Sequence, residues 1–222
     1  MDEGFILKLV MYIVPVIMSI TVHEFAHAWM AYRLGDDTAA SMGRMTLNPL
    51  AHIDPFGTIV LPIMCVLMGA PAFGWAKPVP FNPVRLTRSL RMKHSTMLVG
   101  LAGPVSNLLL ALLMVLVGRL MGIDLNRMND ILSLRGGALD QLIWSLIQIN
   151  VALAIFNLIP VPPLDGSKIL FGLLPDSAYS VMETLEKYSF ILFLVVIFFG
   201  ARLIWVPVQF VIILMLKLMI SV

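Results

Sequence analysis

Charged side chains are scarce in this sequence of 222 residues, of which only 13% are Asp, Glu, Lys or Arg. A soluble domain carries about 25% of these residues, whereas 59% of this chain is hydrophobic and its mean hydropathy is +0.94. The net charge of +2 is too small to indicate a nucleic-acid partner. The composition predicts an α-helical integral membrane protein, because the bilayer replaces much of the water-excluding core.

Cysteine is nearly absent, since Cys65 is the single one in the chain. One cysteine cannot form an internal disulfide, so nothing in the sequence points to an oxidising compartment. A basic N-terminal region is also lacking, because the chain begins Met-Asp-Glu-Gly where a secretory signal peptide is positively charged. We therefore expect the first apolar segment to be a membrane helix and not a cleaved signal peptide.

An HExxH motif stands inside the first apolar segment, residues 9–32, which is otherwise uncharged. Its histidines, His23 and His27, lie on one face of a helix about one turn apart, a spacing that lets both bind one Zn²⁺. Glu24 follows the first histidine and is a candidate general base. Because ionisable groups are costly in a membrane segment, we interpret the motif as a functional site.

A catalytic zinc site has three protein ligands, so the two histidines require a third. The candidates are His52, Asp54, His94, Asp165 and other aspartates of the loops. We expect His52 to lie in a surface loop and His94 to begin a helix without binding metal. Asp165 follows a long apolar segment and a proline-rich stretch, and Gly166 after it allows an unusual turn. Its alternative role is to cap a helix from residue 167, and both interpretations are open.

Four apolar segments predict membrane helices, at residues 9–32, 95–118, 141–159 and 188–222, the last being one kinked helix or two short ones. Residues 55–76 are uncharged but interrupted by Pro and Gly, which predicts a re-entrant segment or a short tilted helix.

The predicted fold is a polytopic bundle of about four to six membrane helices, with the re-entrant segment and short membrane-associated β strands. One such strand is expected at residues 44–48, where polar and apolar side chains weakly alternate. The whole chain is expected to be a single membrane-embedded domain, 1–222, with its core at 9–172 and a C-terminal membrane region at 188–222.

Basic residues indicate the orientation of the chain. Residues 77–93 contain five Lys or Arg and no acid, so this loop is predicted to be cytosolic. The segment 141–159 then ends on the cytosolic side, near Asp165. The two histidines reach the same side only if residues 55–76 return without crossing, so metal binding favours the re-entrant interpretation.

Taken together, these motifs resemble the site-2 protease family of intramembrane zinc metalloproteases. The similar elements are HEFAH at residues 23–27 (the zinc motif), GPVSN at 103–107 (the GxxxN element of the core helix) and NLIPVPPLDG at 157–166 (the segment of the third ligand). They occur in the family's order and the resemblance covers roughly residues 9–172. No insertion large enough for a PDZ domain interrupts the chain, so the resemblance is to a compact member.

The resemblance implies a role for each matching residue. His23, His27 and Asp165 would hold one Zn²⁺, and Glu24 would act as the general base. Asn157 is similar to the family asparagine that helps to hold the substrate carbonyl or its oxyanion.

Two further elements are interpreted by the same resemblance. Gly103 and Asn107 are expected to permit close helix packing beside the site. The GRMTLNP and GWAKP sequences resemble the membrane-associated β region that clamps an extended substrate strand.

The function implied is that of a zinc metalloendopeptidase that cleaves transmembrane protein substrates within the lipid bilayer, in regulated intramembrane proteolysis. The small size predicts a multi-pass protein of a prokaryotic plasma membrane, with the active site toward the cytosol. A metal-binding membrane transporter and an inactive membrane scaffold are the alternatives. A zinc-dependent cut in a co-reconstituted single-span protein would separate the enzyme from both.

Overall fold

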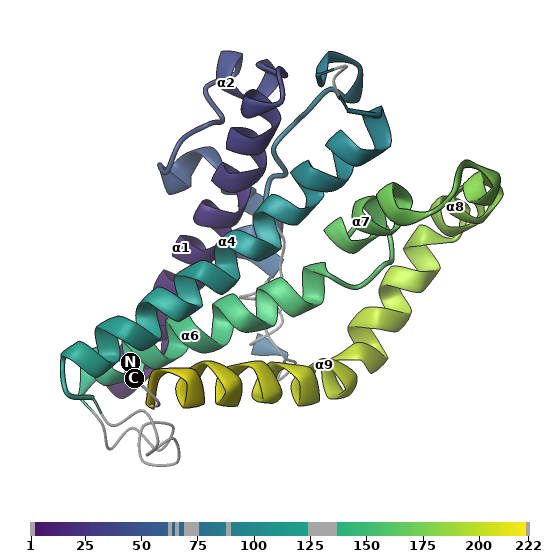
Figure 1. The fold of residues 1–222 in the computed structure, drawn as a ribbon. Coiled ribbons are helices and arrows are strands. Elements are labelled where there is room, and N and C mark those ends of the chain that lie inside the picture. The colour runs from purple at the N-terminus through teal and green to yellow at the C-terminus, as the bar shows by residue number, and fades with distance from the viewer. Residues whose placement is uncertain are drawn as a thin grey trace.

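The computed structural model describes residues 3–61, 64, 67–68, 76–87, 90–123 and 137–220. These residues form helices and irregular segments, with no strand among them. Three long helices, α1 (Glu3–Arg33), α4 (Met92–Leu120) and α6 (Ala138–Asn157), pack against one another, and both chain ends lie at the same end of this bundle (Figure 1).

Each of these three helices is long and apolar enough to cross a membrane, with the candidate span of α1 running from Ile13 to Arg33. They confirm the predicted helices at residues 9–32, 95–118 and 141–159. The prediction of about four to six membrane helices is not confirmed, since three such spans occur among the described residues. The structure is therefore a helical membrane protein with a smaller set of clear spans than the apolar segments suggested.

The C-terminal apolar region is one continuous helix, α9 (Ser189–Ile220), which bends partway along its length (Figure 1). It contains Pro207, a residue that removes a backbone donor from the helical ladder and bends helices. Of the two predicted alternatives for residues 188–222, one kinked helix is correct.

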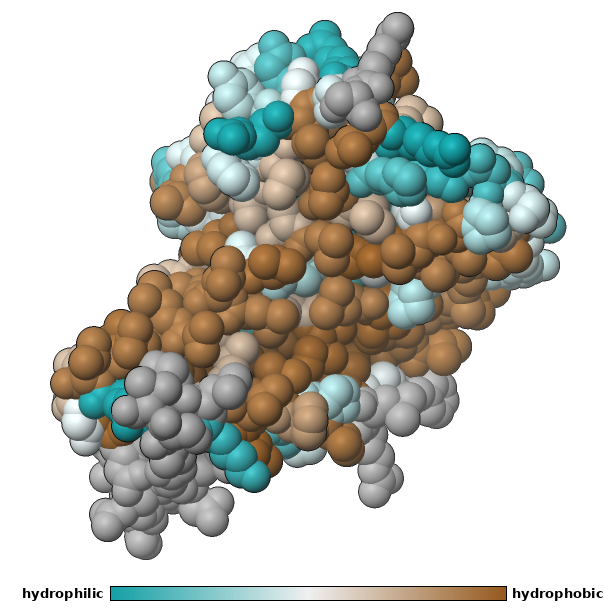
Figure 2. Space-filling model, viewed as in Figure 1, coloured by the Kyte–Doolittle hydropathy of each residue, from teal (hydrophilic) through white to brown (hydrophobic). Residues whose placement is uncertain are grey.

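Shorter helices join the long ones: α2 (Thr38–Ser41), three 3₁₀ turns (Pro49–Ala51, Pro83–Arg85 and Asp176–Ala178), a π-helical turn (Pro55–Val60), α7 (Asp165–Leu173) and α8 (Tyr179–Lys187). Most of them gather at the end of the bundle where α1 finishes and α4 begins (Figure 1). Hydrophilic residues lie at that end, whereas a hydrophobic belt covers the middle of the visible face (Figure 2). This division matches a polar region above a bilayer-spanning part.

The strand predicted at residues 44–48 is wrong. Arg44 turns its side chain inward and donates to the Lys77 carbonyl, while Asn48 accepts from Leu50 N and so caps a 3₁₀ turn. One long-range contact and one local cap thus take the place of the pairing that a strand would need. The second predicted β element includes Gly74 and Trp75, which lie outside the described residues.

Residues 55–76 begin and end at the same place. Lys77 N donates to the His52 carbonyl at 3.0 Å, so the two chain segments that flank this stretch are hydrogen-bonded to each other. A segment with joined ends cannot cross a membrane once, which rules out the single crossing. The re-entrant course itself stays a prediction, because residues 62–63, 65–66 and 69–75 lie outside the described part.

The main apolar core lies between α4, α6 and α9, around the fully buried Trp144, Ile147 and Ile212. A smaller cluster, with Ala31 and Val99 at its centre, joins α1 to α4 beside the metal motif. Helix packing therefore fixes α1, α4 and α6 relative to one another, and α1 carries the HExxH motif in this fixed frame.

Candidate metal centre

Two histidines of α1 meet a carboxylate from a distant part of the sequence at one point between α1, α4 and α7. His23 Nε2 and His27 Nε2 lie 3.1 and 3.0 Å from Asp165 Oδ2, and 3.0 Å from each other. All three residues are buried and form a group that could hold a metal ion. The structure thus brings together the three residues that the sequence singled out as ligands.

Hydrogen bonds on the far side of each imidazole set its tautomer. His23 Nδ1 lies 2.6 Å from Asn107 Oδ1, and His27 Nδ1 lies 2.7 Å from the carbonyl of Val99. Both partners are acceptors, so each Nδ1 carries a proton, and in the neutral ring the lone pair is then on Nε2. Two nitrogen lone pairs therefore point at the Asp165 carboxylate.

Three electron-rich atoms this close together repel one another unless a cation lies between them. Zinc bonds of about 2.0–2.1 Å in a tetrahedral arrangement place two ligand atoms roughly 3.3 Å apart, close to the separations of 3.0–3.1 Å found here. Two neutral imidazoles and one carboxylate are also a common donor set for catalytic zinc. The residues fit the metal on both geometry and chemistry.

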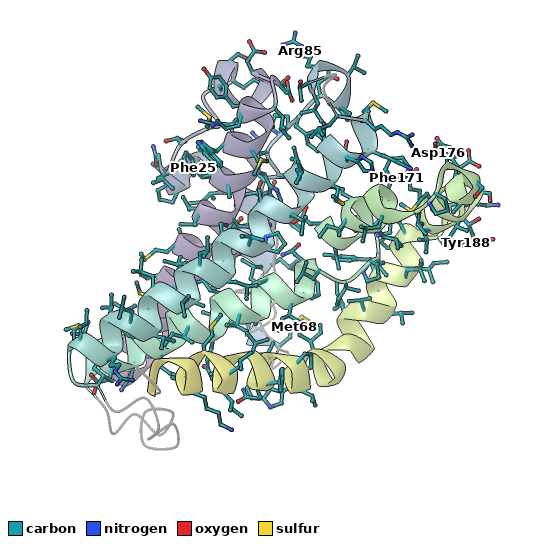
Figure 3. The ribbon with its side chains drawn as sticks, viewed as in Figure 1. Phe25, Met68, Arg85, Phe171, Asp176 and Tyr188 are labelled. Atoms are coloured by element: carbon teal, nitrogen blue, oxygen red, sulfur yellow. The ribbon has the colours of Figure 1, made fainter. Side chains whose placement is uncertain are left out.

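Gly103 allows α4 to approach these histidines. A Cβ at this position would lie 2.4 Å from His27 Nε2 and 2.5 Å from His23 Cε1, closer than any side chain tolerates. Phe25, between the two histidines in the sequence, lies on the side of α1 away from α4 (Figure 3). The prediction that Gly103 permits close helix packing at the site is confirmed.

Asp165 is the first residue of α7, and its carboxylate does not cap the helix. The N-cap residue is Leu164, while Asp165 Oδ1 accepts from Lys168 Nζ at 2.8 Å and Oδ2 faces the histidines. An ammonium at this distance favours the ionised form of the carboxylate. The carboxylate is therefore ionised and suited to bind a cation.

Gly166 is needed for close packing and not for the unusual turn that the sequence predicted. It lies inside α7, and a Cβ there would come within 2.3 Å of the carbonyl oxygens of Leu158 and Ile159. The start of α7 thus rests directly on the end of α6. This contact fixes the position of Asp165 relative to the long helices.

The carboxylate of Glu24 is held by the backbone of a neighbouring segment. Its Oε2 accepts from Val79 N at 2.8 Å. Val79 belongs to an irregular stretch, residues 77–82, which we call the strap. The strap therefore lies against the residue that the sequence identifies as the candidate base.

The strap is attached to several parts of the polar end. Asp36, which is fully buried, accepts from Asn82 N, and Arg44 Nη2 donates to the Lys77 carbonyl. The Phe81 ring lies under the ammonium of Lys168, 5.6 Å from its centroid, and Lys168 in turn pairs with the metal-ligand candidate Asp165. The strap thus contacts both the candidate base and a partner of the metal group.

Asn157 is not part of the metal group. It is the last residue of α6, and its Nδ2 donates to the Leu153 carbonyl in the same helix at 3.0 Å. The predicted role of Asn157 toward a substrate stays a prediction.

Two other histidines lie outside the metal group. His52 is not the surface-loop residue that we predicted, because only 1% of it is exposed. Its Nε2 donates to the Thr46 carbonyl, so the side chain helps to fold the loop onto itself. His94 lies in the first turn of α4, as predicted.

Sequence reasoning missed the supporting residues Asn150, Lys168 and Asp36. The contact of Lys168 with Asp165 could have been predicted, because residues three apart lie on the same side of a helix. Asn150 stood out only as an amide within an apolar span. Nothing in the sequence showed that Asp36 would accept a hydrogen bond from residue 82.

Comparison with known proteins agrees with this geometry. Residues 123–200 match the model of peptidase family M50. "Putative zinc metalloprotease YwhC" of Bacillus subtilis is 40% identical over 196 residues, which are 87% of this chain and 83% of that protein. "Putative zinc metalloprotease Rip2" of Mycolicibacterium smegmatis is 28% identical over 185 residues, 82% of this chain and 64% of that protein. No solved structure gives a significant match.

The likeness to the Bacillus protein extends over most of both chains, and the family model covers the segment of Asp165. Both comparisons point to the same family, and the structure joins His23, His27 and Asp165 in one group that could hold a metal ion. This chain belongs to peptidase family M50, the site-2 protease family.

Proposed function

We propose that this protein is an intramembrane zinc metalloprotease that hydrolyses peptide bonds in or near transmembrane segments of membrane protein substrates. The observation that carries the proposal is the convergence of His23 Nε2, His27 Nε2 and Asp165 Oδ2 within 3.1 Å, each imidazole having its proton on the opposite nitrogen. All three residues are buried, and the two histidines belong to α1, a helix long and apolar enough to cross a membrane.

When bound, zinc supplies a Lewis acid that polarises a carbonyl and lowers the pKa of a bound water from 15.7 to about 7. His23, His27 and Asp165 hold the ion. Glu24 takes a proton at a carboxylate oxygen from the attacking water and delivers it to the leaving nitrogen. Its hydrogen bond from Val79 N orients the carboxylate in the meantime.

Asn157 is proposed to donate to the substrate carbonyl as negative charge develops there. Its position at the end of α6, eight residues before Asp165 in the sequence, supports this role. The side chain would have to exchange its present bond to the Leu153 carbonyl for one to the substrate.

An intramembrane substrate fits the surroundings of the site. A transmembrane helix hides its backbone in internal hydrogen bonds, so it must unwind in a polar region before it can be cut. The strap and the turn before Asp165 lie outside the regular helices, so their backbone groups offer polar partners beside the site. The basic residues of the loop 77–93 support a cytosolic location for this end, in a multi-pass protein of the bacterial plasma membrane.

The test is cleavage of a single-span membrane protein by the purified enzyme in liposomes. We expect Glu24→Gln to abolish cleavage while keeping about one zinc per chain, because the amide cannot accept the proton but leaves the three ligands intact. Cleavage is followed by gel electrophoresis and zinc by elemental analysis.

Asp165→Ala is the matched variant, and it should lose both zinc and cleavage. An unchanged cleavage rate in Glu24→Gln would rule out its role as base. Zinc transport into the liposomes without any cut would favour the transporter, and zinc-free wild-type protein would favour the scaffold.

A further inference from the structure

Two asparagines lie at the centre of the bundle, at the depth of the apolar helices. Asn107 of α4 and Asn150 of α6 are both fully buried, and both helices are long and apolar enough to span a membrane. A buried amide costs free energy unless its donors and acceptors are paired. Their hydrogen bonds should therefore show what purpose they serve.

The two amides form a directed chain that ends at the metal group. Asn150 Nδ2 donates to the Leu146 carbonyl at 2.8 Å, and Asn150 Oδ1 accepts from Asn107 Nδ2 at 2.7 Å. Asn107 Nδ2 also donates to the Ser19 carbonyl at 3.1 Å, and Asn107 Oδ1 faces His23 Nδ1 at 2.6 Å. The chain thus crosses from α6 through α4 to α1.

The direction of this chain is fixed by its backbone partners. The carbonyls of Leu146 and Ser19 can only accept, so both amides must present their oxygen atoms toward the metal side. Because Asn107 Oδ1 is an acceptor, His23 Nδ1 must carry a proton and donate the hydrogen bond. The lone pair of His23 Nε2 is then free to bind metal. Reversing Asn107 would place its NH₂ group against the N–H of His23.

The two histidines are supported differently. His27 Nδ1 is held by a backbone carbonyl, that of Val99, which no side-chain substitution removes. His23 depends on the side chain of Asn107, and one of the two contacts that orient that side chain comes from Asn150. The site therefore has one histidine whose tautomer depends on packing between three helices.

We propose that Asn150 is a positioning residue of the metal centre, which orients the Asn107 amide so that His23 presents Nε2 to the ion. This inference rests on the proposed zinc metalloprotease function. Substitution of a residue that hydrogen-bonds to a metal-binding histidine typically lowers metal affinity about 10- to 100-fold. Asn150 acts one step further away, and its partner keeps a second contact to Ser19.

The test measures zinc affinity of the detergent-purified protein by competition with a chromogenic chelator. We expect Asn107→Leu to weaken zinc binding about 10- to 100-fold and Asn150→Leu roughly three- to tenfold. In the double variant, Asn150→Leu should add nothing to the effect of Asn107→Leu, because its influence passes through that amide. Gln148→Leu, which removes another amide from α6, is the matched control and should bind zinc as the wild type does.

A second measurement separates positioning from packing. Cobalt(II) bound in place of zinc gives an absorption spectrum that reports ligand geometry, and this spectrum should change in Asn150→Leu. Asn150→Ser, which is too short to reach Asn107, gives the same comparison if the leucine variant does not fold.

The inference is overturned if Asn150→Leu, or Asn150→Ser in its place, binds zinc as tightly as the wild type. It is also overturned if the double variant loses the sum of the zinc-binding free energies that the two single variants lose. Asn150 would then act on zinc binding independently of Asn107, through general packing. A wild-type protein that binds zinc but cleaves no membrane substrate would count against the proposed protease and leave the zinc comparison intact.

Discussion

Gly103 leaves no room for even one added methyl group beside the two histidines of the metal centre. We expect Gly103→Ala to abolish zinc binding or to weaken it at least about 100-fold, because the new Cβ would overlap both imidazoles. Zinc content after purification measures the effect. Gly137→Ala is the control, since a Cβ there meets Asp140 only at 3.7 Å; equal zinc in the two variants would contradict the assigned contact.

The ligand residues could be predicted from the sequence, and their support could not. His23 and His27 share one helical face because of their spacing, and the resemblance to a known family identified Asp165. The roles of Asn107 and Asn150 depend on which helices become neighbours, and that is a property of the assembled bundle. Asn107 was expected only to permit close packing, whereas the structure also gives it a hydrogen bond to His23.

Among the elements, the strap is held mainly through polar contacts with buried partners. We expect Asp36→Ala to speed chymotrypsin cleavage at the Phe81–Asn82 bond at least about tenfold, because hydrogen bonds to a charged group contribute about 1.5–3 kcal/mol each and Asp36 accepts from Asn82 N. Time courses in detergent, read by mass spectrometry, measure the rate.

Asp37→Ala is the control for this prediction. Asp37 neighbours Asp36 in the sequence but forms an ion pair with Arg85 in which both side chains are more than half exposed. Such pairs contribute only about 0–1 kcal/mol. If both variants are cleaved at the wild-type rate, Asp36 does not anchor the strap.

The elements that the sequence predicted well are the long helices, because about 20 apolar residues in a row have few alternatives in a membrane. The weak alternation at residues 44–48 predicted a strand and was overruled by the inward turn of Arg44 and the cap at Asn48. The buried state of His52 was missed for a similar reason, since local folding of a polar loop leaves no periodic pattern.

At the scale of the whole molecule, the metal group joins α1 to α7 across 138 residues of sequence between His27 and Asp165. An ion that binds only the folded state stabilises it, by about 2.7 kcal/mol when its free concentration is 100 times the Kd. We therefore expect chelation of zinc to lower the thermal unfolding midpoint of the wild type by several degrees.

His27→Ala should show no such shift on chelation, because it lacks a ligand. Thermal unfolding in detergent, monitored by circular dichroism with and without chelator, makes the comparison. An equal shift in both proteins would mean that the chelator acts elsewhere, and no shift in either would mean that zinc does not tie the two helices together.

The course of the chain between the spans was only partly predictable. The charge pattern indicated on which side α6 ends, and the requirement for a shared metal favoured the same side for the end of α1. In the structure, Asp165 and the two histidines do lie together. The hydrogen bond between residues 77 and 52 could not be foreseen, because a backbone contact between two loops depends on neither side chain.

The separation of the ligands in the sequence also orders events during synthesis. His23 and His27 leave the ribosome early, while Asp165 and the helix that carries it emerge only after α4 and α6 have been made. During synthesis the chain therefore has an incomplete set of candidate ligands until Asp165 has emerged. The proposed proteolysis would therefore begin only after the bundle has assembled, because Asp165 is the last of the three candidate ligands to be made.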